Sequence, residues 1–143
     1  MLACADLCIG PAVAREALAD PPHADVRVSK PLIQSEAISI LAASDPPAIL
    51  SAYDFGKGEH DIIAIGLKRR DVILVIDDHL AFIIATRFGL RPLLTLDVIV
   101  ELVHSHGMPK TVGIEIVRVW QSKNRFGPGF LRHTFEKLNE VMP

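Results

Sequence analysis

The sequence has little cysteine and no long apolar run. Its 143 residues include two Cys, too few for a disulfide framework. No stretch reaches the roughly 18 uninterrupted apolar residues of a membrane-spanning helix, and the longest runs, such as residues 72–76, have the length of a strand. The first six residues carry no basic group and include Asp6, unlike a signal peptide. We therefore expect a cytoplasmic protein with no membrane partner.

Internal repeats and low-complexity segments are also missing, and the charge is nearly balanced. Half of the residues are hydrophobic and 22% are charged, enough apolar surface for one folded domain. The net charge of −2 argues against an indiscriminate nucleic-acid binder. The charge is unevenly spread, however, at −5 over residues 1–66, zero over 67–107 and +3 over 108–143. An acidic N-terminal segment and a basic C-terminal segment suit a carboxylate metal site beside a surface that attracts phosphate.

Helix and strand patterns alternate along the chain. Helices are expected at residues 12–19, 35–43, 59–69, 79–88, 96–106, 110–122 and 130–141, and extended segments at 26–30, 72–76 and 91–95. Residues 72–76 are apolar throughout, which is typical of a central parallel strand buried on both faces. This order predicts an α/β fold with a parallel sheet.

Five carboxylates stand where such a fold places its sites. They are Glu16, Glu59, Asp61, Asp77 and Asp78. Asp77 and Asp78 directly follow the predicted strand 72–76, and ligands bind outside the carboxyl ends of parallel strands. Clustered carboxylates repel one another, and a hard divalent cation such as Mg²⁺ or Mn²⁺ removes that cost. Such a site can activate water for attack on a phosphodiester.

Each of these acids also has a structural interpretation. Asp78 could cap the helix that follows it, Glu59 could stabilise a helix dipole, and Glu16 could be a solvated helix residue. Asp61 fits a supporting or surface position better than a ligand position. His60 and His79 are expected to face solvent at the starts of their helices.

Several segments together resemble one family, the PIN-domain proteins. Residues 56–65 (GKGEHDIIAI) resemble its helix start G-E-x-x-A-I, and residues 76–85 resemble its strand end L-D-D-x-x-A-R-x-x-A. Residues 88–96 resemble its G-L-x-x-x-G-T-x-G-x-L, 106–108 its K-x-G-L-I turn, and 7–16 its v-x-v-P-x-x-V-x-x-E-L segment. The similarity is greatest to a branch of predicted nucleic-acid-binding proteins often encoded in toxin–antitoxin operons.

The resemblance implies a three-layer α/β/α fold with a short parallel sheet and ribonuclease activity dependent on Mg²⁺ or Mn²⁺. By position, the metal ligands would be Glu16, Glu59, Asp77 and Asp78, and the catalytic residues Glu59, Asp77, Asp78 and Thr95. Asp78 would be a ligand or orient water, and Thr95 would match the family's hydroxyl. The implied partners are RNA, an antitoxin protein and a second copy of the chain in a dimer.

The sequence also departs from the family pattern. The family begins with a strand that ends in Asp, some 20 residues before the segment matched at Leu7, and this chain starts too late for it. Phe82 replaces the Arg that follows the Asp pair, and Leu94 and Asp97 replace the two glycines around Thr95. We therefore expect one PIN-like domain over residues 1–143, truncated at its N-terminus. We expect either a ribonuclease, intact or degenerate, or an inactive binding or oligomerisation module.

Two further readings concern other residues. The string at 73–78 also resembles the first strand of a response-regulator receiver, but no Asp stands near residue 120, where that fold needs its phosphate acceptor. Trp120, Phe130 and Phe135 are spaced as core residues of two helices, or as a surface for a partner helix. A basic set could contact RNA phosphates; it comprises Lys68, Arg69, Arg70, Arg87, Arg91, Lys123, Arg125 and Arg132.

Overall fold

The computed structural model describes residues 6–19, 26–42, 45 and 47–141. These fall into two compact units, an N-terminal unit of residues 6–92 and a C-terminal unit of residues 93–141. The assignment of residues 1–143 to one domain stays a prediction. No helix within the described ranges combines the length and the apolar character that crossing a membrane would require.

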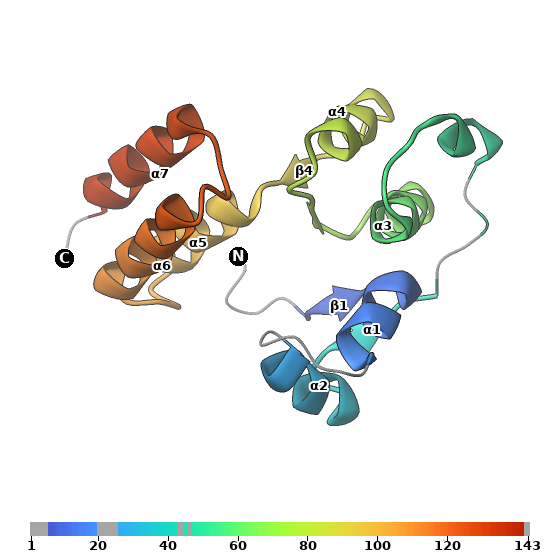
Figure 1. Ribbon diagram of the computed structural model, residues 1–143, viewed down its shortest axis with the longest axis horizontal. Helices are drawn as coiled ribbons and strands as arrows, with labels where there is room; N and C mark the ends of the chain where they lie inside the picture. Colours follow the sequence, from blue (N-terminus) through green and yellow to red (C-terminus); the bar gives the residue numbers. More distant parts are fainter. Residues whose placement is uncertain (1–5, 20–25, 43–44, 46, 142–143) are drawn as a thin grey trace. The chain divides into compact units, whose positions relative to one another are not determined.

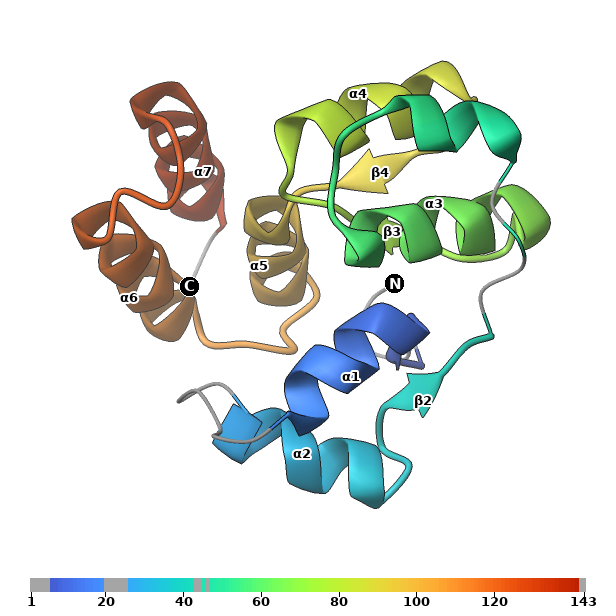
Figure 2. The same ribbon diagram turned by 45° about the vertical axis from the view of Figure 1, so that its right-hand side comes forward.

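The N-terminal unit contains short strands and four α-helices (Figures 1 and 2). In chain order these are β1 (Cys8–Ile9), α1 (Pro11–Leu18), α2 (Val26–Gln34), β2 (Ser39–Ile40), the 3₁₀-helix η2 (Ala48–Ala52), α3 (Lys57–Lys68), β3 (Leu74–Val75), α4 (His79–Arg87) and β4 (Pro92–Leu93). The division between the units falls within β4. The strands pair as β1 with β2 and β3 with β4. This confirms the predicted α/β class.

The strand at residues 74–75 is shorter than the predicted 72–76 and is buried on one face. Leu74 and Ile76 are each 3% exposed, whereas Ile73 is 47% and Val75 38% exposed. Alternate residues of a strand point to opposite faces, so only the Leu74 face belongs to the core. That core lies between α3, β3 and α4, and its buried residues are Leu50, Ile63, Leu74, Ile76, Ala81, Ile84, Ala85 and Leu90.

The prediction of an extended segment at 26–30 is wrong, because α2 covers these residues. The β-branched Val26 and Val28 suggested a strand, and Pro31 argued against a helix through this region. In the structure α2 packs against α1 (Figure 2) and buries Ile33. Packing of an apolar face outweighs local propensity, which is a weak guide by itself.

The predicted helix at 35–43 is also wrong over residues 35–42; residue 43 lies outside the described residues. Glu36 has a φ of 60°, in the left-handed region, which ends α2 instead of continuing a helix. The chain then turns into β2, which pairs in parallel with β1 in the register Cys8 with Ser39 and Ile9 with Ile40.

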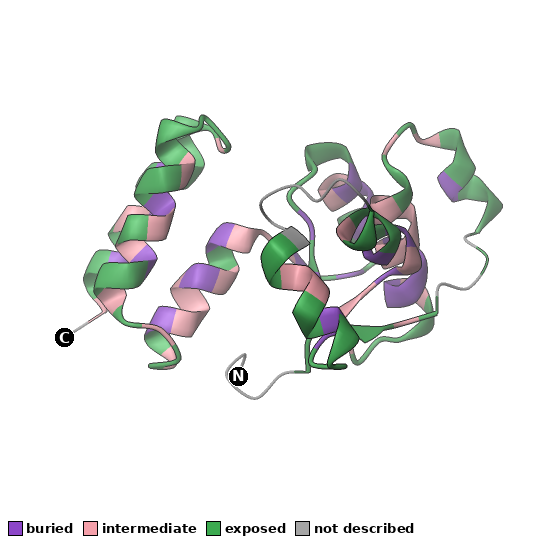
Figure 3. Ribbon diagram, turned by 60° about the horizontal axis from the view of Figure 1, so that its bottom comes forward, coloured by how far each residue is buried: buried purple, intermediate pink, exposed green. Residues whose placement is uncertain are grey.

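The C-terminal unit consists of α5 (Thr95–His104), α6 (Lys110–Ser122) and α7 (Pro128–Glu140). All three helices were predicted, with ends that differ by at most two residues. They pack against one another around a core of Leu96, Ile99, Val103, Val117, Leu131 and Leu138. Figure 3 shows buried and half-buried positions along these helices, separated by exposed positions on their outer sides. Of the three aromatics singled out in the sequence, Trp120 and Phe135 pack against this core and Phe130 is exposed.

Candidate metal and catalytic site

The N-terminus of α1 is fixed by a side chain of α3. Asp61 Oδ2 accepts a hydrogen bond from the backbone N–H of Ala12 at 2.7 Å, one of the first-turn donors that have no partner within a helix. The chain enters α1 through Gly10, and a Cβ atom at Gly10 would lie 2.9 Å from Cβ of Asp61. Gly10 therefore gives Asp61 the space to approach. The expectation that Asp61 is not a ligand agrees with this use of its carboxylate.

A second contact shows how α1 lies along α3. A Cβ atom at Gly58 would lie 3.1 Å from Cγ2 of Val13, whereas the start of α1 contacts Asp61. Both contacts join the first turn of α1 to the N-terminal half of α3. Glu16 follows Val13 by nearly one turn of α1. Its side chain is exposed.

Glu59 lies in the first turn of α3, and its side chain folds back over the start of the helix. A Cβ atom at Gly56, the N-cap residue, would collide with Oε2 of Glu59. The carboxylate therefore lies at the positive end of the α3 dipole, where negative charge is favourable. Glu16 lies on α1, which packs against α3, and no contact of its side chain with Glu59 is seen among the described residues.

His60 is placed differently from the prediction. Its ring centroid lies 4.3 Å from that of Phe55, at an interplanar angle of 42°, and its side chain is half-buried. The solvent-facing assignment is therefore wrong for His60, whereas His79 is exposed as predicted. An aromatic residue shortly before a helix start was the only signal in the sequence for this contact.

The two aspartates after β3 have different environments. Asp77 is exposed at the end of the strand segment. Asp78 is the N-cap of α4, and its Oδ1 accepts a hydrogen bond from the backbone N–H of Ala81 at 2.8 Å. The capping interpretation of Asp78 is therefore confirmed, and one of its carboxylate oxygens is engaged by the helix.

Thr95 belongs to the C-terminal unit, where it is the first residue of α5 and half-buried. Asp97, which stands at one of the family's glycine positions, accepts a hydrogen bond from the backbone N–H of Leu94 at 2.8 Å. The departure from the family pattern at Asp97 thus supplies a cap for α5, a function that the sequence reasoning missed.

The donor chemistry of these residues suits a hard divalent cation, because carboxylate oxygens are the ligands that Mg²⁺ and Mn²⁺ prefer. The side chains are not assembled around one point, however. In the part of the chain that the structure describes, no three His, Cys, Asp or Glu side chains form a group that could hold a metal ion. The assignment of Glu16, Glu59, Asp77 and Asp78 as ligands, and of Thr95 as a catalytic residue, stays a prediction.

Comparison with known proteins gives one match. A family model described as PIN domain matches residues 3–140. No curated protein and no solved structure matches the chain. The family model covers nearly the whole sequence and includes every carboxylate discussed above. The chain therefore belongs to the PIN-domain family.

Proposed function

We propose that this protein is a divalent-metal-dependent ribonuclease that hydrolyses RNA phosphodiesters. The observation that carries the proposal is the position of the Glu59 carboxylate at the start of α3, the helix against which α1, which contains Glu16, is packed. Membership of the PIN-domain family, whose fold is nuclease-like, supports the same reading.

The proposed ligands of Mg²⁺ or Mn²⁺ are Glu16, Glu59 and Asp77. When bound, such a cation activates water and stabilises the charge that develops on the attacked phosphate. We assign Asp78 an auxiliary part, because its Oδ1 is already bonded to the N–H of Ala81. Thr95 is proposed as the hydroxyl of the reaction on the family likeness alone, because it belongs to the C-terminal unit.

The chain's own residues prepare this site in two ways. The start of α3 places a positive helix end beside Glu59, which offsets part of the repulsion between clustered carboxylates. The hydrogen bond from Ala12 to Asp61 holds α1, the helix that contains Glu16, on α3.

The proposed partners are RNA as substrate and an antitoxin protein as inhibitor. The antitoxin follows only from the likeness to the toxin–antitoxin branch, and RNA from the family as a whole. The basic C-terminal stretch, at +3 over residues 108–143, is consistent with an anionic substrate.

A cleavage assay tests the proposal. The full chain is incubated with a labelled single-stranded RNA in Mn²⁺ or in EDTA, beside Asp77→Asn and the control Asp54→Asn, which alters another exposed Asp of the same unit. We expect Mn²⁺-dependent cleavage that Asp54→Asn retains and Asp77→Asn lowers by about a hundredfold or more, since even outer-sphere changes cost about 10–100-fold. Equal rates for wild type and Asp77→Asn would contradict the assignment.

An inactive binding module is the second candidate function. It is favoured by the lack of an assembled three-ligand group among the described residues and by the use of Asp61 and Asp78 as helix caps. An exposed apolar stripe on α6, with Val112 and Val119, supplies a surface for association. This candidate predicts no metal-dependent cleavage and a stable oligomer or complex in size-exclusion chromatography.

A further inference from the structure

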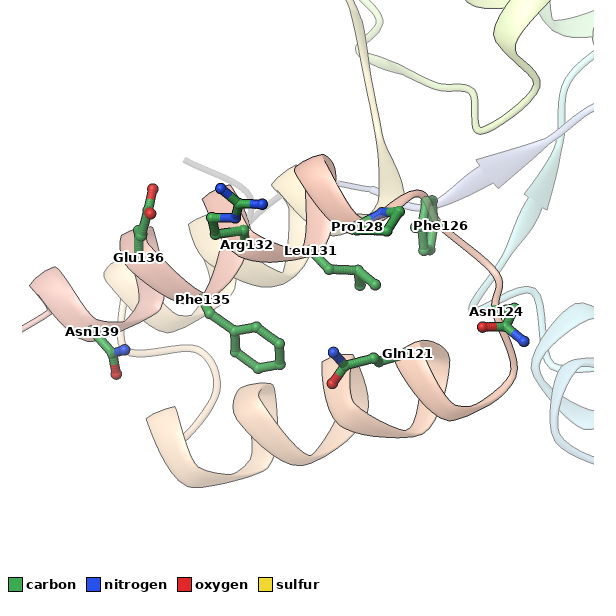
Figure 4. Close-up of a pocket in the computed structure, with 9 residues that line it drawn as sticks. All are labelled: Gln121, Asn124, Phe126, Pro128, Leu131, Arg132, Phe135, Glu136 and Asn139. Atoms are coloured by element: carbon green, nitrogen blue, oxygen red, sulfur yellow. The ribbon is translucent and has the colours of Figure 1, made fainter.

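We propose that the groove between α6 and α7 binds an unpaired nucleotide of single-stranded RNA. The groove lies entirely in the C-terminal unit and has a volume of about 540 Å³ (Figure 4). That volume is within the range of small-ligand sites, about 300–1,000 Å³. None of the carboxylates assigned to the cation belongs to it.

The floor of the groove is apolar and partly aromatic. Leu131 is buried, and Phe126 and Phe135 are half-buried. Figure 4 shows Leu131 and Phe135 extending from α7 toward α6. A half-buried phenyl ring beside open space offers a surface on which a base can stack, and stacking on aromatic side chains is the usual means of holding unpaired bases.

The rim of the groove carries three amide side chains, those of Gln121, Asn124 and Asn139. All three are exposed, and within the described residues none of these side chains makes a hydrogen bond. An amide group presents both donors and an acceptor, which matches the mixed donor and acceptor edge of a base. An apolar helix from a protein partner would leave these groups unpaired at a cost.

The charge around the groove favours an anion over a neutral peptide. Arg132 and Glu136 both line the groove, one charge of each sign, and the surplus of positive charge comes from Lys123 and Arg125, which flank Asn124 in the turn between the helices. The Arg125 guanidinium lies 5.6 Å from the Trp120 ring centroid and 6.0 Å from that of Phe126, so cation–π contacts hold it at this turn. These cations are placed to attract the phosphates on either side of a bound base.

The choice of RNA as the ligand rests on the proposed ribonuclease function, but binding here is separable from cleavage. Because Trp120 is the single tryptophan of the chain and lies 5.6 Å, ring to ring, from Phe126 of the groove, its fluorescence reports on this turn. The full chain is therefore titrated with hexaadenylate RNA in EDTA, and affinity is read from Trp120 emission and from fluorescence anisotropy of labelled RNA.

Four variants define the expected result. Phe135→Leu removes the ring and keeps an apolar filler, and we expect it to weaken hexaadenylate binding about tenfold, as loss of one stacked base would. Gln121→Leu, at an exposed position that does not threaten folding, should also weaken it. Arg132→Gln should reduce the dependence of log affinity on log salt concentration by about 0.7. Arg118→Gln makes the same charge change on α6 outside the groove, and it should weaken hexaadenylate binding less than any of these three variants.

Three results would overturn the proposal. These are unchanged affinity in both Phe135→Leu and Gln121→Leu, equal affinity for hexaadenylate and for an RNA duplex, and an RNA-free oligomer that Phe135→Leu dissociates, which would place a second copy in the groove. The two proposals fail separately. If the groove binds RNA but neither the wild type nor any variant cleaves RNA, only the ribonuclease assignment fails. If Phe135→Leu cleaves RNA with wild-type KM, only the groove assignment fails.

Discussion

Asp61 of α3 and Ala12 of α1 are joined by a hydrogen bond of 2.7 Å, from the backbone N–H of Ala12 to Oδ2 of Asp61. The bond connects residues 49 positions apart in the chain. One of the five candidate carboxylates thus serves as a helix cap supplied by another helix. Because it fixes α1 on α3, it also determines where Glu16 lies.

Replacing Asp61 by Ala should destabilise the protein. The N–H of Ala12 loses its acceptor at a part-buried position, and loss of a helix N-cap interaction costs about 0.5–2 kcal/mol of unfolding free energy. Urea denaturation of Asp61→Ala measures this cost, with Asp54→Ala as the control at an exposed Asp of the same unit. Similar denaturation midpoints for the two variants would show that the bond contributes nothing to stability.

Substitutions at Asp78 separate its capping from any part in the reaction. Asp78→Ala should lower the unfolding free energy by about 1 kcal/mol, because the N–H of Ala81 loses its partner. Asp78→Asn should keep the stability, since Asn caps helices as well as Asp does. It should also keep more Mn²⁺-dependent ribonuclease activity than Asp77→Asn. A stable Asp78→Asn protein that is as inactive as Asp77→Asn would instead make Asp78 the primary ligand.

The helices with clear boundary signals were predictable from the sequence. Gly10-Pro11 begins α1, because proline suits the first helical position. Gly127-Pro128 begins α7 in the same way, two residues before the predicted start at residue 130. Residues 26–42 were mispredicted because their structure depends on distant partners. α2 forms by packing on α1, and β2 forms by pairing with β1. Neither partner can be identified from the local residue pattern.

The candidate site was predictable as a set of acids but not as a geometry. Strand order and family likeness indicated Glu16, Glu59 and Asp77, and the structure shows that the Glu59 carboxylate lies at the start of α3. The sequence could not show where each carboxylate points. Asp61 reaches a backbone N–H of another helix, and Glu59 folds over Gly56. Those orientations depend on the space left by Gly10 beside Asp61 and by Gly56 beside Glu59.

The Arg69–Asp71 pair predicts a pH effect with a definite sign. Arg69 donates from Nε to Oδ1 of Asp71 at 3.3 Å and from Nη2 to Oδ2 at 2.8 Å. These hydrogen bonds, more than the charge of Arg69, lower the pKa of Asp71 below its ordinary value. An acid with a lowered pKa stabilises the folded state above its unfolded pKa, and this contribution is lost as the pH falls through the folded pKa. The effect on stability should be small, because both side chains are exposed.

Carboxyl titration by NMR measures this shift directly. The Asp71 midpoint should lie below its ordinary range, and Arg69→Gln should raise it. A midpoint that Arg69→Gln leaves unchanged would mean that the pair does not persist in solution. Since Arg69 is engaged by Asp71, Lys68 and Arg70 are better placed than Arg69 to meet RNA phosphates.

Two glycines of the C-terminal unit should respond in opposite directions to alanine. A Cβ atom at Gly113 of α6 would lie 2.7 Å from Cγ2 of the buried Val103 and 3.4 Å from Cγ2 of Ile99. Gly113→Ala should therefore force α6 away from α5 and lower the unfolding free energy by about 1–3 kcal/mol. At Gly129, in the first turn of α7, a Cβ atom would meet nothing within 4 Å. Gly129→Ala should raise the unfolding free energy by about 0.5–1 kcal/mol, because alanine loses less backbone entropy in a helix. Urea denaturation of both variants tests the close approach of α5 and α6. A Gly113→Ala protein as stable as the Gly129→Ala protein would refute that close approach.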